Sequence, residues 1–165
     1  METDVLGTRG VISRTGYTGE VGFELYVPAS SAGKVWEGLL QAGEKAGISP
    51  CGLGARDLLR LEVGYLLYGL DMDEQIAPLE AGAVFAVDFT KGEFIGRPAL
   101  LEQKEKGPAK LLAAFELVQK GVPRHGMKIY HDGKEVGSVT SGTMSPMNGT
   151  GIALGYVTHE LARNG

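Results

Sequence analysis

The chain has 165 residues, of which 43% are hydrophobic and 22% charged, and its formal net charge is −4. This length allows one compact domain or two small ones. The basic residues do not cluster beyond the segment 104–106, which excludes the electrostatic footprint of a nucleic-acid-binding protein. Glycine, with 26 residues, reaches roughly twice its usual share and predicts tight turns and close backbone approaches.

The composition also bears on where the protein works. The single cysteine, Cys51, excludes an internal disulfide framework and suits a reducing compartment. A buried small hydrophobe is the more ordinary role for such a thiol than a nucleophile. No apolar run approaches the ~20 residues that span a bilayer, and residues 1–4 lack the pattern of a signal peptide. We expect a cytoplasmic protein, or a mitochondrial matrix protein in a eukaryote, without membrane or nucleic-acid partners.

Strands and helices alternate in the first part of the chain. Short apolar runs flank a glycine-rich turn, and further along apolar residues recur at helical spacing. Hydroxyl side chains at 30–31 offer N-caps for the first helix, and Gly47 is a natural stop. We therefore expect strands at 11–13 and 23–27 and helices at 32–46 and 55–63.

The second of these helices carries an informative arginine. Arg56 and Asp57 both fall in its predicted first turn. Asp57 agrees with the helix dipole, but a cation there works against it by up to ~1 kcal/mol. Arg56 therefore points to an anionic ligand or a carboxylate partner.

The segment from 65 to 107 is predicted to be mixed. The acidic run Asp71, Asp73 and Glu74 lacks the glycine and spaced glutamate of a calcium-binding EF-hand loop, so a solvated surface turn is the better interpretation. We expect a short helix from Ile76 to Glu80, a strand at 83–89 and a helix from 96 to 106.

The pattern changes near Gly107. Strand-like runs follow at 111–118, 127–131, 135–140 and 152–157, and Asp132-Gly133 has the signature of a hairpin turn. We therefore predict an α+β fold in two domains, an α+β region at 1–107 and an all-β partial barrel at 108–165. The strands are too few for a closed barrel, so open sheet edges are expected.

The glycine-rich turn concentrates polar side chains that could form a binding site. Gly16, Gly19 and Gly22 do not have the spacing of a dinucleotide-binding loop, and the three histidines lack the spacing of a helical metal site. Glu24 shares its strand face with Tyr26, whereas the face of 23, 25 and 27 is the predicted core. From this pattern alone a solvated face is favoured over a polar pocket for Glu24.

The motifs in this chain resemble those of the aminomethyltransferase (T-protein) of the glycine cleavage system. The similarity follows the same order over nearly the whole chain. It rests on the segments 14–24, 54–62, Tyr68-Gly69, 78–82, 94–97, 123–126, 139–143 and Ser145-Pro146.

The resemblance implies a reaction and a binding site. Members of this family transfer a one-carbon unit from the aminomethyl-lipoyl arm of the H-protein to tetrahydrofolate, with release of ammonia. By this resemblance Glu24 would hold the pterin ring and Arg56 the folate, and Tyr17 and Glu20 would help to form the pocket wall. No metal is implied.

Two departures from the family pattern qualify this expectation. The family's essential aspartate lies in its N-terminal half, which has no counterpart here, and its last strands follow the equivalent of Gly165. We therefore expect a fragment with part of the folate site, no catalytic residue and weak or no activity alone. The alternatives are a non-catalytic folate-binding or assembly module and a related folate-dependent enzyme.

Overall fold

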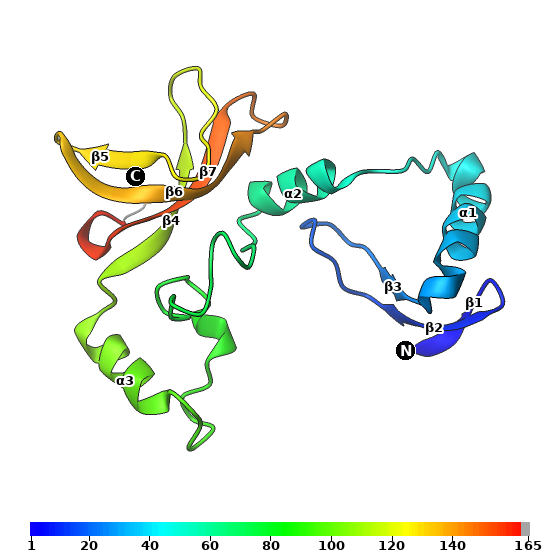
Figure 1. Cartoon of the computed structure of the whole chain (residues 1–165), viewed down its shortest axis with the longest axis horizontal. Helices are drawn as coiled ribbons and strands as arrows, with labels where there is room; N and C mark the ends of the chain where they lie inside the picture. The colour runs from blue at the N-terminus through cyan, green and yellow to red at the C-terminus, as the bar shows by residue number, and fades with distance from the viewer. Residues whose placement is uncertain (163–165) are drawn as a thin grey trace. The chain divides into compact units, whose positions relative to one another are not determined.

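The computed structural model describes residues 1–162 and divides into two compact units, Met1–Val63 and Gly64–Gly165. Each unit contains helical segments and an antiparallel sheet (Figure 1). This confirms the α+β class. The contacts divide the chain at residue 63, whereas the sequence pattern changes near Gly107, and the predicted division into domains at 107 stays a prediction.

The sheet of the first unit has three strands in the order β1 (Glu2–Val5), β2 (Thr8–Ser13) and β3 (Glu24–Tyr26). The predicted strands at 11–13 and 23–27 are confirmed, but β1 was missed. A two-residue turn joins β1 to β2, and both of its residues have positive φ, 53° at Leu6 and 73° at Gly7. Such a turn matches the twist of a hairpin, and the Gly7 N–H donates to Asp4 at 2.7 Å.

The helical segments of this unit follow in chain order. They are the short 3-10 helix η1 (Ala29–Ser31), α1 (Ala32–Gly43), the 3-10 turn η2 (Glu44–Ala46) and α2 (Leu53–Glu62). The expected stop at Gly47 is confirmed by its left-handed φ of 74°. The expected hydroxyl N-cap is wrong, because no side chain caps α1 and the chain enters it directly from η1.

Cys51 is exposed, which corrects the expectation of a buried thiol.

Helix α2 begins two residues earlier than predicted. Arg56 is therefore its fourth residue and Asp57 its fifth, and the argument from the helix dipole weakens because the effect is confined to the first turn. Instead, Asp57 accepts a hydrogen bond of 2.7 Å from the guanidinium of the buried Arg60.

The second unit opens with turns and one helix. The strand predicted at 83–89 is wrong: this segment holds the single 3-10 turn η3 (Val84–Ala86), after Gly82 with a φ of 73°. The helix predicted at 76–80 is a turn, in which the Ala77 N–H donates to the carboxyl group of Glu80 at 2.9 Å. The predicted helix at 96–106 is confirmed as α3 (Arg97–Lys106).

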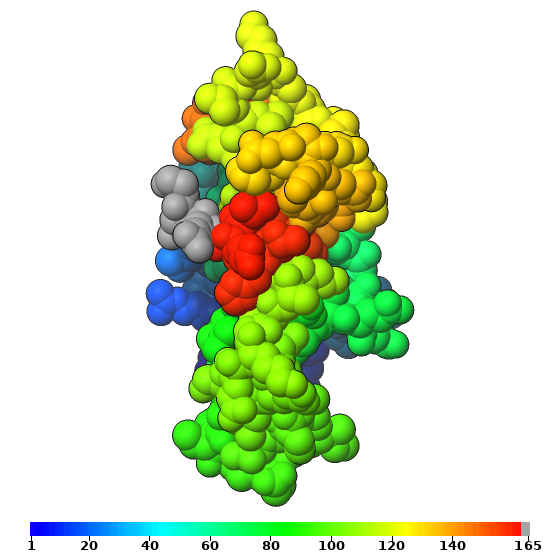
Figure 2. Space-filling view, turned by 90° about the vertical axis from the view of Figure 1, so that its left-hand side faces the viewer, coloured from blue at the N-terminus to red at the C-terminus, as the bar shows by residue number. Residues whose placement is uncertain are grey.

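A four-stranded antiparallel sheet completes this unit, in the order β4 (Lys110–Glu116), β7 (Gly151–Thr158), β6 (Lys134–Met144) and β5 (Lys128–His131). The four strands confirm the predicted β segments. Asp132 and Gly133, with φ of 49° and 76°, form the expected hairpin turn. After β7, the 3-10 turn η4 (His159–Leu161) lies against the segment that leads into β4 (Figure 2).

The sheet is open within the described residues, as expected. Strands β4 and β5 are its two edges. Part of the β4 edge is covered, because the Leu112 N–H donates to the Glu80 carbonyl at 2.9 Å. At the other edge β5 is short and irregular, features that limit pairing with another chain.

A buried polar cluster joins this sheet to the turns before it. Asp71 has no exposed surface, which corrects its predicted place in a solvated turn, whereas its neighbours Asp73 and Glu74 are exposed as expected. The hydroxyl of Thr140 on β6 donates to the Asp71 carboxyl group at 2.5 Å. The hydroxyl of Tyr156 on β7 donates to the Asp71 backbone carbonyl at 2.7 Å.

Candidate functional site

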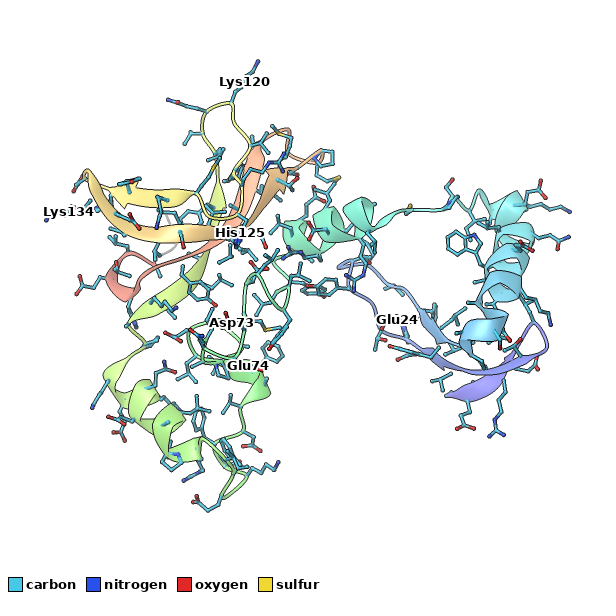
Figure 3. The ribbon with its side chains drawn as sticks, viewed as in Figure 1. Glu24, Asp73, Glu74, Lys120, His125 and Lys134 are labelled. Carbon is cyan, nitrogen blue, oxygen red and sulfur yellow. The ribbon has the colours of Figure 1, made fainter. Side chains whose placement is uncertain are left out.

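Glu24 is the first residue of β3 (Figure 3). It pairs with Ser13 of β2 in the sheet. Its side chain is half-buried. One carboxylate oxygen, Oε2, accepts a hydrogen bond from the hydroxyl of Thr15. The other oxygen takes part in no hydrogen bond within residues 1–162. Glu24 is therefore an oriented, partly buried carboxylate with further capacity to accept hydrogen bonds.

Tyr17 and Arg56 are brought together from the glycine-rich turn and from α2. The central carbon of the Arg56 guanidinium lies 4.4 Å from the centre of the Tyr17 ring. This cation–π contact places the guanidinium over the ring. The N–H donors of the guanidinium lie in the plane of the group and suit a carboxylate or a ring carbonyl.

The structure does not bring the whole predicted set together. Glu20 is exposed, and its backbone N–H donates to the Thr18 hydroxyl at 3.3 Å. Within residues 1–162, Glu24 and Arg56 form no ion pair with each other. No ion pair therefore links the Tyr17–Arg56 pair to the Thr15–Glu24 pair, and the binding roles of Glu24, Arg56, Tyr17 and Glu20 stay predictions.

One part of the strand-face prediction fails near the site. Tyr26 is exposed, as expected for the face of Glu24, but Phe23 is also 66% exposed although its parity placed it in the core. Phe23 lies just before β3 begins, so the alternation of a strand does not apply to it.

Sequence reasoning missed Thr15, which contacts Glu24 directly. The register of β2 and β3 places Ser13 opposite Glu24, and Thr15 follows two residues later. Its place in the turn, two residues after the end of β2, was the signal that could have identified it.

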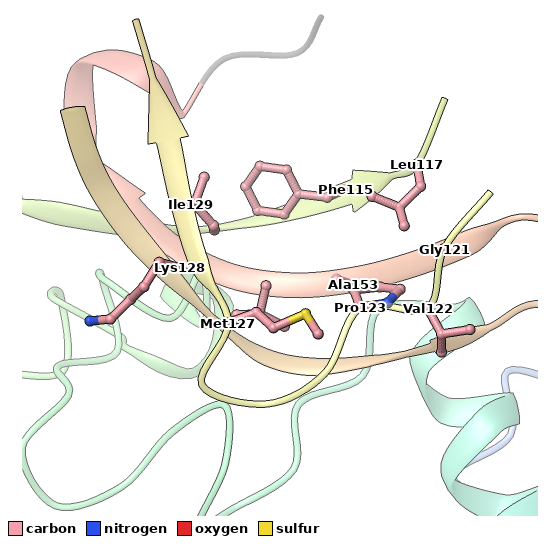
Figure 4. Close-up of a pocket in the computed structure, with 10 residues that line it drawn as sticks. Phe115, Leu117, Gly121, Val122, Pro123, Met127, Lys128, Ile129 and Ala153 are labelled. Carbon is pink, nitrogen blue, oxygen red and sulfur yellow. The ribbon is translucent and has the colours of Figure 1, made fainter. Parts of the chain in front are cut away.

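The described residues offer no alternative metal centre, since no three His, Cys, Asp or Glu side chains gather there in a way that could hold an ion. A cavity of about 480 Å³ lies over the sheet of the second unit (Figure 4). Phe115 of β4, Ile129 of β5 and Ala153 of β7 line it, and none of the predicted site residues does. Its lining is apolar apart from Lys128, so it lacks the convergent polar groups of a typical ligand site.

Among the described helices, none has both the length and the apolar character that a membrane crossing would need.

Family models match both parts of the chain. The model of the GCVT N-terminal domain matches residues 1–91, and that of the glycine cleavage T-protein C-terminal barrel domain matches residues 110–165. The two matches together leave only the region around α3 uncovered.

Curated relatives and a solved structure agree with these matches. The chain is 52% identical to an aminomethyltransferase of Halothermothrix orenii over 96% of the chain and 44% of the relative. It is 53% identical to that of Thermosynechococcus vestitus over 98% and 43%. The crystal structure of the glycine cleavage system aminomethyltransferase T from Bartonella henselae superposes with a TM-score of 0.83 at 36% identity, covering 89% of this chain and 41% of that one. The chain thus spans less than half the length of these relatives.

Proposed function

Since this chain belongs to the glycine cleavage T-protein family, we propose that it provides part of the tetrahydrofolate site of an aminomethyltransferase. The proposed reaction moves a one-carbon unit from the aminomethyl-lipoyl arm of the H-protein to tetrahydrofolate and releases ammonia. The bacterial relatives support a cytoplasmic setting for it.

The observation that carries the proposal is the presence of an oriented carboxylate and an oriented guanidinium in one unit. The half-buried Glu24 offers acceptors that suit a ring with adjacent N–H donors, such as a pterin. Arg56, held on Tyr17, offers a donor fork that suits a carboxylate tail or a ring carbonyl. The donor set therefore fits a folate, which in this reaction accepts the one-carbon unit.

The residues named here bind and orient the acceptor, and none of them is assigned a proton transfer. We propose that Glu20, exposed on the same turn, contributes to the wall of the pocket and not to its floor.

Calorimetry with tetrahydrofolate tests the site. Glu24→Ala and Arg56→Ala should each weaken binding by about 10-fold or more, because hydrogen bonds to charged groups contribute roughly 1.5–3 kcal/mol. Glu37→Ala and Lys45→Ala, which remove exposed charges on α1 and η2, are the matched controls and should leave binding unchanged. Equal losses in all four variants, or no binding by the unmodified chain, would refute a retained folate site.

The partial coverage of the relatives' length supports a second candidate function. A chain spanning 44% of an aminomethyltransferase can bind folate as a non-catalytic module without completing the reaction. Ammonia release from aminomethylated H-protein separates the two functions. We expect weak or no release by this chain alone; turnover that depends on tetrahydrofolate would contradict the module and establish catalysis.

A further inference from the structure

Thr15 occupies a particular place beside the candidate site. It lies in the turn just after β2, and its hydroxyl contacts two side chains at once. One is the Oε2 atom of Glu24, and the other is the hydroxyl of Ser13, at 2.9 Å. Ser13 and Glu24 are also direct partners in the ladder between β2 and β3, so the strand pairing fixes the backbone positions of both.

The number of hydroxyl hydrogens determines which group donates in each hydrogen bond of this cluster. A threonine hydroxyl has a single hydrogen, and Thr15 donates it to the Glu24 carboxylate. The contact between the hydroxyls must then be a hydrogen bond donated by Ser13 to Thr15. A carboxylate has about four lone-pair positions. Thr15 occupies one of them, so both oxygens of Glu24 keep the capacity to accept from a ligand.

We propose that Thr15 is a positioning residue, which fixes the rotamer of Glu24 so that its carboxylate is preorganised for adjacent N–H donors on a ring. This inference rests on the proposed function, because Glu24 is its point of action. Ordering a flexible side chain on binding costs roughly 0.5–1.5 kcal/mol. A glutamate that Thr15 has already ordered avoids this cost, and the corresponding gain in affinity is about 2- to 12-fold.

A purely structural role for Thr15 would be to close the turn. Thr18 is the matched control for this possibility, because its hydroxyl also makes a contact within the turn, accepting from the Glu20 N–H at 3.3 Å. Thr18 forms no hydrogen bond with Glu24 within the described residues. A residue that only closes the turn should behave like Thr18.

The test is a double-mutant cycle with tetrahydrofolate as the titrant in calorimetry. Thr15→Val should weaken binding by about 2- to 12-fold, and Thr15→Ser should restore most of the loss. In the Glu24→Ala background Thr15→Val should have no further effect, because the residue acts through Glu24. An equal loss in both backgrounds, or an equal loss in Thr18→Val, would overturn the inference.

The ¹³C chemical shift of the Glu24 carboxyl carbon gives a second readout that needs no ligand. Thr15→Val should move this resonance, and Thr18→Val should leave it in place. Should the unmodified chain bind no tetrahydrofolate, the proposed function fails, and a moved resonance would still support the positioning of Glu24 by Thr15. An unmoved resonance would overturn that positioning as well.

Discussion

The buried contact between Asp71 and Thr140 is expected to be a main determinant of the stability of the second unit. Asp71 has 0% of its surface exposed and Thr140 has 8%. The Thr140 hydroxyl donates its one hydrogen to the Asp71 carboxyl group at 2.5 Å, closer than its 3.2 Å contact with the Leu154 carbonyl. Thr140→Val keeps the shape of the side chain but removes this donor.

The expected magnitude follows from the burial. Losing a hydrogen bond to a buried carboxyl group costs about 1–3 kcal/mol, and the near-equal volume of valine adds no cavity cost. The other Asp71 oxygen accepts from the Leu67 N–H at 2.9 Å, a contact that the substitution leaves in place. We therefore expect the free energy of unfolding of this unit to fall by about 1–3 kcal/mol.

Urea unfolding followed by NMR signals of β7 amides measures this change in the affected unit. With a urea dependence of roughly 1–3 kcal/mol per molar, the midpoint should fall by about 1 M. Thr143→Val is the matched control, because Thr143 lies on the same strand and its side chain forms no hydrogen bond within residues 1–162. A difference of less than about 0.5 kcal/mol between the two variants, the usual range for unremarkable substitutions, would refute the reasoning.

Two further predictions concern the same sheet. Burial, and after it the negative charges of Glu80 and Asp71, raise the pKa of Tyr156 above its ordinary value of 10.0. The contribution of this phenol to stability is therefore complete below pH 10.0 and is lost as the pH rises beyond it. In an absorbance titration at 295 nm, Tyr156→Phe should remove a late phase, the ionisation of this phenol at high pH. In Gly137→Ala the new Cβ would overlap the Tyr156 backbone carbonyl across the β6–β7 ladder. Thermal unfolding should show that the free energy of unfolding falls by about 1–3 kcal/mol or more. The control Gly33→Ala, at a helical position with open space, should raise it by roughly 0.5–1 kcal/mol. A late phase that persists in Tyr156→Phe, or a tolerated Gly137→Ala, would contradict the respective prediction.

Elements with strong local signals could be predicted from the sequence. The helical spacing of Val35 and its apolar neighbours gave α1, and the hairpin at Asp132-Gly133 followed from its turn residues. The segment 83–89 shows where this reasoning fails. Its alternating residues satisfy the pattern of a strand, but a strand also needs a partner with free backbone groups, and η3 has none in the described structure.

The sequence by itself determined the family, the order of the β segments and the presence of Glu24 on a strand after a glycine-rich turn. Each of these depends on residues that are neighbours along the chain or repeat at a fixed spacing. Only the tertiary structure decided that Asp71 is buried, because its partner Thr140 lies 69 residues away and burial is a property of the chain segments that surround a residue. It also decided that Thr15 holds Glu24 and that Arg56 lies on Tyr17. These contacts depend on how the turn folds back on β3 and α2, and no spacing in the sequence encodes that distance.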